Sequence, residues 1–256
     1  LLCHILGASK AQLYTEQERS LSSAETKHLQ HLVPRRFHHE PAAYILQHCE
    51  FYGIDFYVDY RTFIPRPETE LLVEEAIEFV HCLSSPENQF TIADIGTGNG
   101  AIAISLALAL PHVEVYATDI SALALEVAEI NRRRHRLDSR VELLQGNLLE
   151  PLPQPVDMIV ANLPYIRSCE LQRLSPEIIN FEPMIALAGG EDGLDKIRQL
   201  IEQAQGGIDS GGCLLLEIGQ GQDKAVTLLI NSYFPKATIE LTPDLSGISR
   251  LVKAIL

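Results

Sequence analysis

The sequence is poor in closely spaced cysteines, in long apolar runs and in positive charge. Its 5 Cys among 256 residues are scattered, and no two form a Cys-x-x-Cys pair. Scattered cysteines are typical of reduced thiols in a cytosol-like compartment. No apolar run reaches the roughly 18 residues that would span a bilayer, and the first residues do not form a secretory signal. We therefore expect a cytoplasmic protein that does not bind membranes.

The shortage of positive charge is concentrated in one part of the chain. The sequence carries 20 Lys and Arg against 34 Asp and Glu, a formal net charge of −14. Residues 1–65 are nearly neutral, with 6 basic and 7 acidic residues, so residues 66–256 carry almost the whole excess. An acidic domain lacks the broad basic footprint that duplex DNA or ribosomal RNA requires. We expect no nucleic-acid partner, whereas a protein substrate is compatible with this charge.

The first 65 residues predict two small units. Residues 1–48 place apolar side chains at helical spacing, which predicts short helices broken at Pro34 and Pro41. Residues 49–64 instead crowd aromatic and β-branched side chains around a glycine, which predicts a β-hairpin. His28, His31, His38 and His39 of the first unit have no cysteine near them in the sequence, so we expect no metal site. The predicted domains are therefore helical residues 1–48, a hairpin linker 49–65 and a third domain 66–256.

The third domain alternates strands with helices. Strand patterns lie at residues 90–95, 113–118, 141–145, 156–161 and 213–218, with two final strands near 238–241 and 250–255. Helical patterns lie at residues 69–80, 101–110, 121–136, 194–205 and 222–233, and a loop is predicted at 84–88. Such alternation indicates an α/β fold, in which a mostly parallel sheet is covered by helices on both faces.

A glycine-rich loop follows the first strand of this domain. The sequence runs Asp94-Ile95-Gly96-Thr97-Gly98-Asn99-Gly100 and then enters a predicted helix. Glycines at this place let a ligand approach the backbone closely, next to a helix N-terminus. The second strand ends at Asp119, whose carboxylate can accept hydrogen bonds from both hydroxyls of a ribose. The spacing also suits a nicotinamide dinucleotide, so that class of enzyme stays open at this point.

The ends of the third and fourth strands add further candidates. Asn147 and Leu148 follow the third strand and could meet the edge and face of an adenine. The fourth strand runs straight into Asn162-Leu163-Pro164-Tyr165, at the carboxyl end where open α/β sheets bind ligands. The side-chain oxygen of Asn162 and the backbone carbonyl of Leu163 offer two acceptors for an –NH2 group, and Tyr165 offers a flat surface for a planar group. A simple turn explains an isolated tetrapeptide equally well, but the glycine loop upstream favours a binding site.

These motifs, in this order, resemble the class I S-adenosylmethionine methyltransferases that methylate planar nitrogens. Three further segments are similar to the HemK/PrmC family of peptide chain release factor glutamine N5-methyltransferases. They are residues 41–46 with 51–53, residues 63–70 (Phe-Ile-Pro-Arg-Pro-Glu-Thr-Glu) and residues 181–187. The resemblance covers the chain from about residue 30 to its end.

The resemblance implies a fold, a reaction and a set of site residues. The fold is a seven-stranded, mostly parallel, Rossmann-like sheet behind a helical substrate-recognition domain and a hairpin. The reaction moves a methyl group from S-adenosylmethionine to the glutamine of the Gly-Gly-Gln loop in class I release factors and leaves S-adenosylhomocysteine. By resemblance the cofactor lies on Asp94, Gly96, Thr97, Gly98, Asn99, Gly100, Asp119, Asn147, Leu148 and Asn162. The catalytic, substrate-binding residues are Asn162, Leu163, Pro164 and Tyr165, with Arg66 and Glu70 shaping the crevice, and we expect a monomer.

Two residues depart from the family pattern, and three other functions compete with it. Leu163 stands where the family has proline, so it keeps the backbone carbonyl but loses stiffness. Asn147 stands where an acidic residue is usual, and its oxygen can still accept from an adenine amino group. The alternatives are methylation of a ribosomal protein glutamine, methylation of adenine N6 in nucleic acid, and cofactor binding without catalysis. The intact Asn162 and Tyr165 weigh against the last of these.

Overall fold

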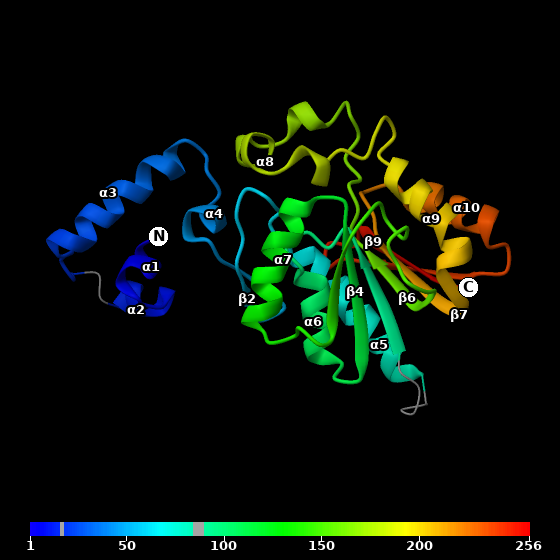
Figure 1. Cartoon of the computed structure of the whole chain (residues 1–256). Coiled ribbons are helices and arrows are strands. Elements are labelled where there is room, and N and C mark those ends of the chain that lie inside the picture. Colours follow the sequence, from blue (N-terminus) through cyan, green and yellow to red (C-terminus); the bar gives the residue numbers. More distant parts are fainter. Residues whose placement is uncertain (16–17, 84–89) are drawn as a thin grey trace.

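A computed structural model of the chain describes residues 1–15, 18–83 and 90–256, so the loop predicted at residues 84–88 lies outside the described residues. The chain forms a helical N-terminal unit, a short hairpin and a sheet flanked by helices (Figure 1). In the described part of the chain, no helix is long and apolar enough to cross a membrane.

Seven strands form one mixed sheet in the order β5-β4-β3-β6-β7-β9-β8. They are β3 (Phe90–Ile95), β4 (Val113–Asp119), β5 (Val141–Gln145), β6 (Val156–Ala161), β7 (Ile208–Glu217), β8 (Thr238–Pro243) and β9 (Ser249–Ile255). Strands β3 to β7 pair in parallel, and β9 runs antiparallel to both β7 and β8. The predicted α/β fold with a mostly parallel, seven-stranded sheet is confirmed.

Strand β7 begins earlier than its sequence pattern indicates, at Ile208 rather than at residue 213. The added part is polar and glycine-rich, so it lacks the apolar signal of a buried strand. It extends the sheet because the chain end lies beside it: the Gly211 amide donates to the Leu256 carbonyl and the Leu256 amide donates to the Gly212 carbonyl, at 2.9 and 3.0 Å. A contact so distant in sequence leaves no local pattern.

Helices cover both faces of the sheet (Figure 1). They are α5 (Glu70–Cys82), α6 (Ala101–Ala109) and α7 (Ala122–Arg134) on one face, and α9 (Asp195–Gly207) and α10 (Asp223–Tyr233) on the other. Two separate apolar cores result, one formed with α5 and α6 and one formed with α9 and α10. Residues 101–107 of α6 are all buried, which explains why this helix is apolar on every side.

The N-terminal unit contains α1 (Leu2–Leu6), α2 (Lys10–Thr15), α3 (Ser23–Phe37) and α4 (Ala42–Leu46). The break predicted at Pro34 is wrong, because α3 continues through that residue to Phe37. Proline removes one backbone donor, and the carbonyl that loses it belongs to Gln30, which is exposed and can bond water. The break predicted at Pro41 is confirmed, since α4 begins directly after it.

The hairpin is shorter than its sequence segment and lies against the sheet domain. It pairs β1 (Cys49–Phe51) with β2 (Ile54–Phe56) across a turn in which Tyr52 and Gly53 both have positive φ, 53° and 69°. This is the two-residue turn that matches the twist of a hairpin. Phe51 and Phe56 are 1% and 0% exposed and belong to the core beside α5 and α6. The hairpin therefore fixes the chain that follows it to the sheet domain.

Asn131 of α7 ties this linker to the glycine loop. Its side chain is fully buried. The oxygen accepts from the Tyr57 amide at 2.7 Å, and the nitrogen donates to the carbonyls of Tyr57 and Asn99 at 2.9 and 2.8 Å. One amide thus satisfies three backbone groups from two segments that border the same end of the sheet.

We expect Asn131→Ala to lower the free energy of unfolding by about 2–4 kcal/mol, because it leaves buried backbone groups without partners. Urea denaturation measures this change. Asn231→Ala, at an exposed position of α10, is the matched control and should change stability by less than about 0.5 kcal/mol. Equal effects of the two substitutions would show that the Asn131 hydrogen bonds contribute little.

Candidate active site

The strand register brings the predicted motifs to one edge of the sheet. Ile95 of β3 pairs with Thr118 of β4 on one side and with Ala161 of β6 on the other. The glycine loop, Asp119 and Asn162 therefore all begin at the same level. The sheet also grows in opposite directions from β3, toward β4 and β5 on one side and toward β6 and β7 on the other. Such a change of direction is the switch point at which open α/β sheets form a ligand crevice.

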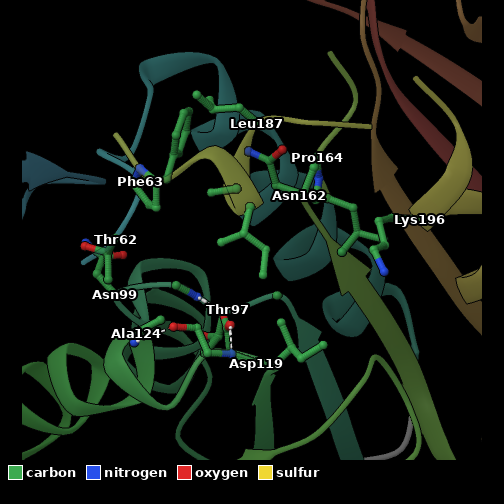
Figure 2. A pocket seen from close by; sticks show the side chains of 18 of the residues that line it. Thr62, Phe63, Thr97, Asn99, Asp119, Ala124, Asn162, Pro164, Leu187 and Lys196 are labelled. Atoms are coloured by element: carbon green, nitrogen blue, oxygen red, sulfur yellow. Dashed lines mark hydrogen bonds between the residues drawn. The ribbon is translucent and has the colours of Figure 1, made fainter. Parts of the chain in front are cut away.

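A cavity of about 270 Å³ lies at this edge. Figure 2 shows Asn162 and Pro164 at one side of it and Thr97 and Asp119 at the other. The predicted residues that line it are Gly96, Thr97, Gly98, Asn99, Asp119, Asn147, Leu148, Asn162, Leu163, Pro164 and Tyr165. Four predicted residues do not line it: Asp94 and Gly100 at the two ends of the glycine loop, and Arg66 and Glu70.

The glycine loop is held by its neighbour strand and needs its glycines. The amides of Gly96 and Thr97 both donate to the Thr118 carbonyl at 2.9 Å. Gly96, Gly98 and Gly100 have φ of 74°, 59° and 83°, a region that side chains with a Cβ rarely adopt. At Gly96 an added Cβ would also lie 3.1 Å from Cδ2 of Leu163. The loop is therefore a fixed surface on which backbone groups face the cavity.

Asp94 supports the loop from below and is completely buried. Its Oδ2 accepts from the Thr97 hydroxyl at 2.6 Å and from the Ala103 amide of α6 at 3.1 Å. Its Oδ1 is buried and has no partner among the described residues. Burial raises the pKa of this carboxyl to about 7. The two hydrogen bonds that Oδ2 accepts only partly offset the cost of burying a charge on this carboxyl.

Asp119 closes the cavity at the end of β4. Its two oxygens accept from the Gly98 amide and the Ser121 amide, each at 2.9 Å, so the carboxylate orders both the glycine loop and the start of α7. Burial raises its pKa, and these backbone amides act in the opposite direction. Each oxygen retains a further lone pair toward the cavity, where it can accept from a ligand hydroxyl.

The Asn162–Tyr165 segment forms the opposite wall. The Asn162 Nδ2 donates to the Thr69 hydroxyl at 3.0 Å, which leaves its Oδ1 as an acceptor. Leu163 is 4% exposed and packs on Gly96, so its side chain links the two walls in a way that a proline ring would not reproduce. Asn147 donates from Nδ2 to Glu150 at 2.9 Å, and its Oδ1 likewise stays free to accept.

The remaining wall comes mainly from two segments that overlap the family-like stretches 63–70 and 181–187, of which only Arg66 and Glu70 were expected near the site. The lining residues are Arg61, Thr62, Phe63 and Pro65 of the linker, Thr69 just beyond it, and Pro183, Ile185, Ala186 and Leu187 after α8 (Pro176–Phe181). Glu182 joins them: it is 5% exposed, accepts from the Ile64 amide at 3.2 Å and pairs with Arg66. Arg66 also lies 4.5 Å over the Phe63 ring, so it shapes the wall without touching the cavity.

Glu70 has a different role from the expected one, and Lys196 lines the cavity although it was not predicted to. Glu70 accepts from the Tyr52 amide at 2.8 Å and so holds the hairpin turn. Lys196 of α9 lines the cavity near Pro164 (Figure 2), and no motif in the sequence marks it. Among the residues that the structure describes, no group of three His, Cys, Asp or Glu side chains is arranged to hold a metal.

Comparisons with known proteins agree with the sequence motifs. The family model for the PrmC N-terminal domain matches residues 1–46, and the model for the methyltransferase small domain matches residues 76–180. A release factor glutamine methyltransferase of Thermodesulfovibrio yellowstonii is 38% identical over 254 residues, which cover 98% of this chain and 89% of that protein. One of Moorella thermoacetica is 42% identical over 243 residues, covering 94% and 84%.

Solved structures share the fold at low sequence identity. The catalytic domain of hMettl16 in complex with a MAT2A 3′UTR hairpin has a TM-score of 0.61 and 16% identity, and the match covers 80% of this chain and 76% of that one. The ribosomal protein L11 methylase of Lactobacillus delbrueckii subsp. bulgaricus has a TM-score of 0.52 and 20% identity, covering 75% and 79%. The predicted class I methyltransferase fold is confirmed, and these two likenesses carry nothing beyond the fold.

The state of Asp94 predicts a pH effect on stability. Because its pKa is raised to about 7 in the folded chain, the folded state keeps a proton that the unfolded chain loses near the ordinary value of about 4. This contribution to stability is complete below about pH 4 and is lost as the pH rises through about 7. Asp94→Asn mimics the neutral acid and does not titrate.

We therefore expect the melting temperature of Asp94→Asn to rise relative to wild type between about pH 5 and about pH 8. Scanning calorimetry of both proteins at several pH values measures the difference between their melting temperatures. The other titrating groups are common to both proteins, so their contributions cancel in this difference. A difference that is independent of pH would mean that Asp94 is charged throughout.

Proposed function

The chain belongs to the family of release factor glutamine methyltransferases, and from this premise we propose that it methylates the side-chain amide nitrogen of a glutamine in a class I peptide chain release factor. The proposed methyl donor is S-adenosylmethionine. The observation that carries the proposal is the position of Asn162, with its free oxygen, across one cavity from Asp119 and the glycine loop (Figure 2).

The residues at the glycine loop fit the proposed cofactor. The Asp119 carboxylate has lone pairs toward the cavity for the two ribose hydroxyls, and the glycines leave room for close approach of the chain. Leu148, 7% exposed, and the exposed Ile120 add apolar lining beside Asn147, which suits an adenine face and its amino group. When bound, S-adenosylmethionine supplies a methyl group on a sulfonium, which is already a good leaving group.

The opposite wall fits a primary amide. A carboxamide nitrogen is a poor nucleophile because its lone pair is delocalised into the carbonyl. Two acceptors, the Asn162 Oδ1 and the Leu163 carbonyl, would hold both N–H groups and favour the nitrogen as it becomes tetrahedral and positive. The Tyr165 ring would stack on the amide plane, and Pro164 would fix the loop. The acceptors thus supply orientation and charge stabilisation without a strong base, and the methylated nitrogen then loses one proton to water.

One assay tests the function directly. The chain is incubated with labelled S-adenosylmethionine and a purified class I release factor, and the labelled residue is mapped by mass spectrometry. We expect one label, on the glutamine of the Gly-Gly-Gln loop. A ribosomal protein and a structured RNA in parallel reactions test the two alternatives that share the tetrapeptide. Labelling of either in place of the release factor would overturn the proposal.

Substitutions on the two walls should separate catalysis from cofactor binding. We expect Asn162→Ala to lower kcat by about 10²–10³, the scale for one preorganised contact in the transition state, with little change in the Kd for S-adenosylmethionine. Asp119→Ala should instead weaken cofactor binding by about 1.5–3 kcal/mol, because charged hydrogen bonds are left unmade. Methylation kinetics and calorimetry measure the two effects. Near-normal turnover of Asn162→Ala would remove that residue from the mechanism.

The N-terminal unit is the proposed docking surface for the rest of the release factor. A lone glutamine gives little binding energy, so specificity needs contacts outside the cavity. The end of α3 lies beside α8, where Arg36 pairs with Glu177, and α8 leads directly into the segment that lines the cavity. Phe37, the last residue of α3, is 80% exposed. These contacts support the proposal that residues 1–48 bind a protein whose glutamine loop enters the site.

We expect Phe37→Ser to lower kcat/KM for the intact release factor by about tenfold, the effect of losing roughly 1.4 kcal/mol of binding. The effect should appear in KM, while the Kd for S-adenosylmethionine is unchanged. Leu228→Ser is the matched control, because Leu228 is 71% exposed on α10, outside the N-terminal unit. Equal kinetics of the Phe37 variant and the control would place the docking surface elsewhere.

A further inference from the structure

We propose that Thr69 and Glu217 are positioning residues that hold the Asn162 amide in the orientation required for methyl transfer. Neither touches the amide nitrogen of the substrate: Thr69 acts through Asn162, and Glu217 acts through Thr69. The inference rests on the proposed function, since it concerns how the same site handles a primary amide.

A continuous line of hydrogen bonds connects these residues. The Asn162 Nδ2 donates to the Thr69 hydroxyl at 3.0 Å, and that hydroxyl donates to Glu217 Oε2 at 2.7 Å. The other carboxyl oxygen, Oε1, accepts from the Tyr165 hydroxyl at 3.3 Å. Thr69 is 4% exposed and Glu217 is 3% exposed, so water does not compete for these partners. One carboxylate therefore supports both polar side chains of the tetrapeptide.

All hydrogen bonds from Asn162 to Glu217 donate in the same direction, and an acceptor at the end of the chain of bonds fixes that direction. A carboxylate offers no proton, so the Thr69 hydroxyl must donate to it and presents a lone pair to Asn162. Asn162 must then turn its nitrogen toward Thr69, which leaves its oxygen for the –NH2 of the substrate. Without Glu217 the hydroxyl could donate to Asn162 instead. The amide would then be stable in the flipped orientation, with its –NH2 facing the –NH2 of the substrate.

Both carboxyl oxygens of Glu217 act as acceptors, one from Thr69 and one from Tyr165. Burial raises the pKa of Glu217 overall, although these two hydrogen bonds act in the opposite direction. Arg250 also lowers the pKa and Glu68 raises it. Arg250 is paired with Asp244 at 3.0 Å, so Glu217 is not needed to balance that charge. A buried acid without a necessary partner is costly to stability, which points to a functional reason for its presence.

The test uses Thr69→Val, which keeps the shape of the side chain without the hydroxyl, and Glu217→Leu, which removes the terminal acceptor. With the full chain, S-adenosylmethionine and a release factor, each should lower kcat about 10- to 100-fold. KM and the cofactor Kd should stay within about twofold of wild type. The double variant should be no slower than either single variant, because the two residues act as one unit. Thr69→Ser, which restores the hydroxyl, should recover most of the rate.

A matched control excludes a general effect of removing a buried threonine. Thr91 is 7% exposed, and its hydroxyl donates to the Asp157 carboxylate at 2.8 Å, at the opposite end of the same strands. Thr91→Val removes the same kind of hydrogen bond and should leave kcat unchanged. Thermal unfolding of each variant shows whether it is folded at the assay temperature.

An NMR measurement provides a readout that does not depend on turnover. The side-chain –NH2 signals of 15N-labelled Asn162 should shift, and the hydrogens should exchange faster, in Thr69→Val but not in Thr91→Val. Wild-type kcat in Thr69→Val, or unchanged Asn162 signals there, would overturn the positioning role. If wild type itself does not methylate the release factor, the proposed function fails, whereas the NMR comparison still decides whether Thr69 orients Asn162.

Discussion

The pairing of β3 with β6 is the constraint on which the site depends. These strands neighbour each other in the sheet although some 60 residues separate them in the chain. Their register sets Ile95 opposite Ala161, so the glycine loop and the Asn162–Tyr165 segment leave the sheet at one level. A shift of one residue would turn every side chain of a strand to the other face. The buried, apolar faces of both strands therefore fix the width of the cavity as well as the fold.

Hydrogen bonds of buried polar side chains fix the other segments that form the site. Asn131, Glu182 and Glu217 each join two or more segments that are distant in sequence. Every such group would destabilise the fold if it lost its partners, so each is a strong constraint on where those segments lie. Asn131 and Glu182 contact the linker at Tyr57 and Ile64, and Glu217 contacts Thr69 just beyond it. The linker is thus part of the site wall rather than a spacer between domains.

The sheet and its loops could be predicted from the sequence because their signals are local. Apolar runs mark the central strands, and glycines and asparagine mark the loops at their ends. The helix break predicted at Pro34 is wrong because an exposed helix tolerates the loss of one hydrogen bond. The roles of Glu182 and Glu217 were not predicted for another reason: each is a single acid whose partners are distant along the chain, 118 residues for Ile64 and Glu182, and 148 and 52 residues for Thr69 and Tyr165 with Glu217. The one local hint for Glu217 was a carboxylate within the otherwise apolar stretch 213–218.

Leu163 shows how a departure from the family pattern can be absorbed. Under the proposed function the Asn162–Tyr165 segment presents the residue 163 carbonyl in a fixed direction, and a proline there would stiffen it through its ring. In this chain the leucine side chain is buried and contacts Gly96 instead, where even one added carbon would lie 3.1 Å away. Packing thus replaces ring stiffness as the source of rigidity. The same contact makes Gly96 necessary on two grounds, its positive φ and its closeness to the opposite wall, so the two walls of the cavity cannot vary independently.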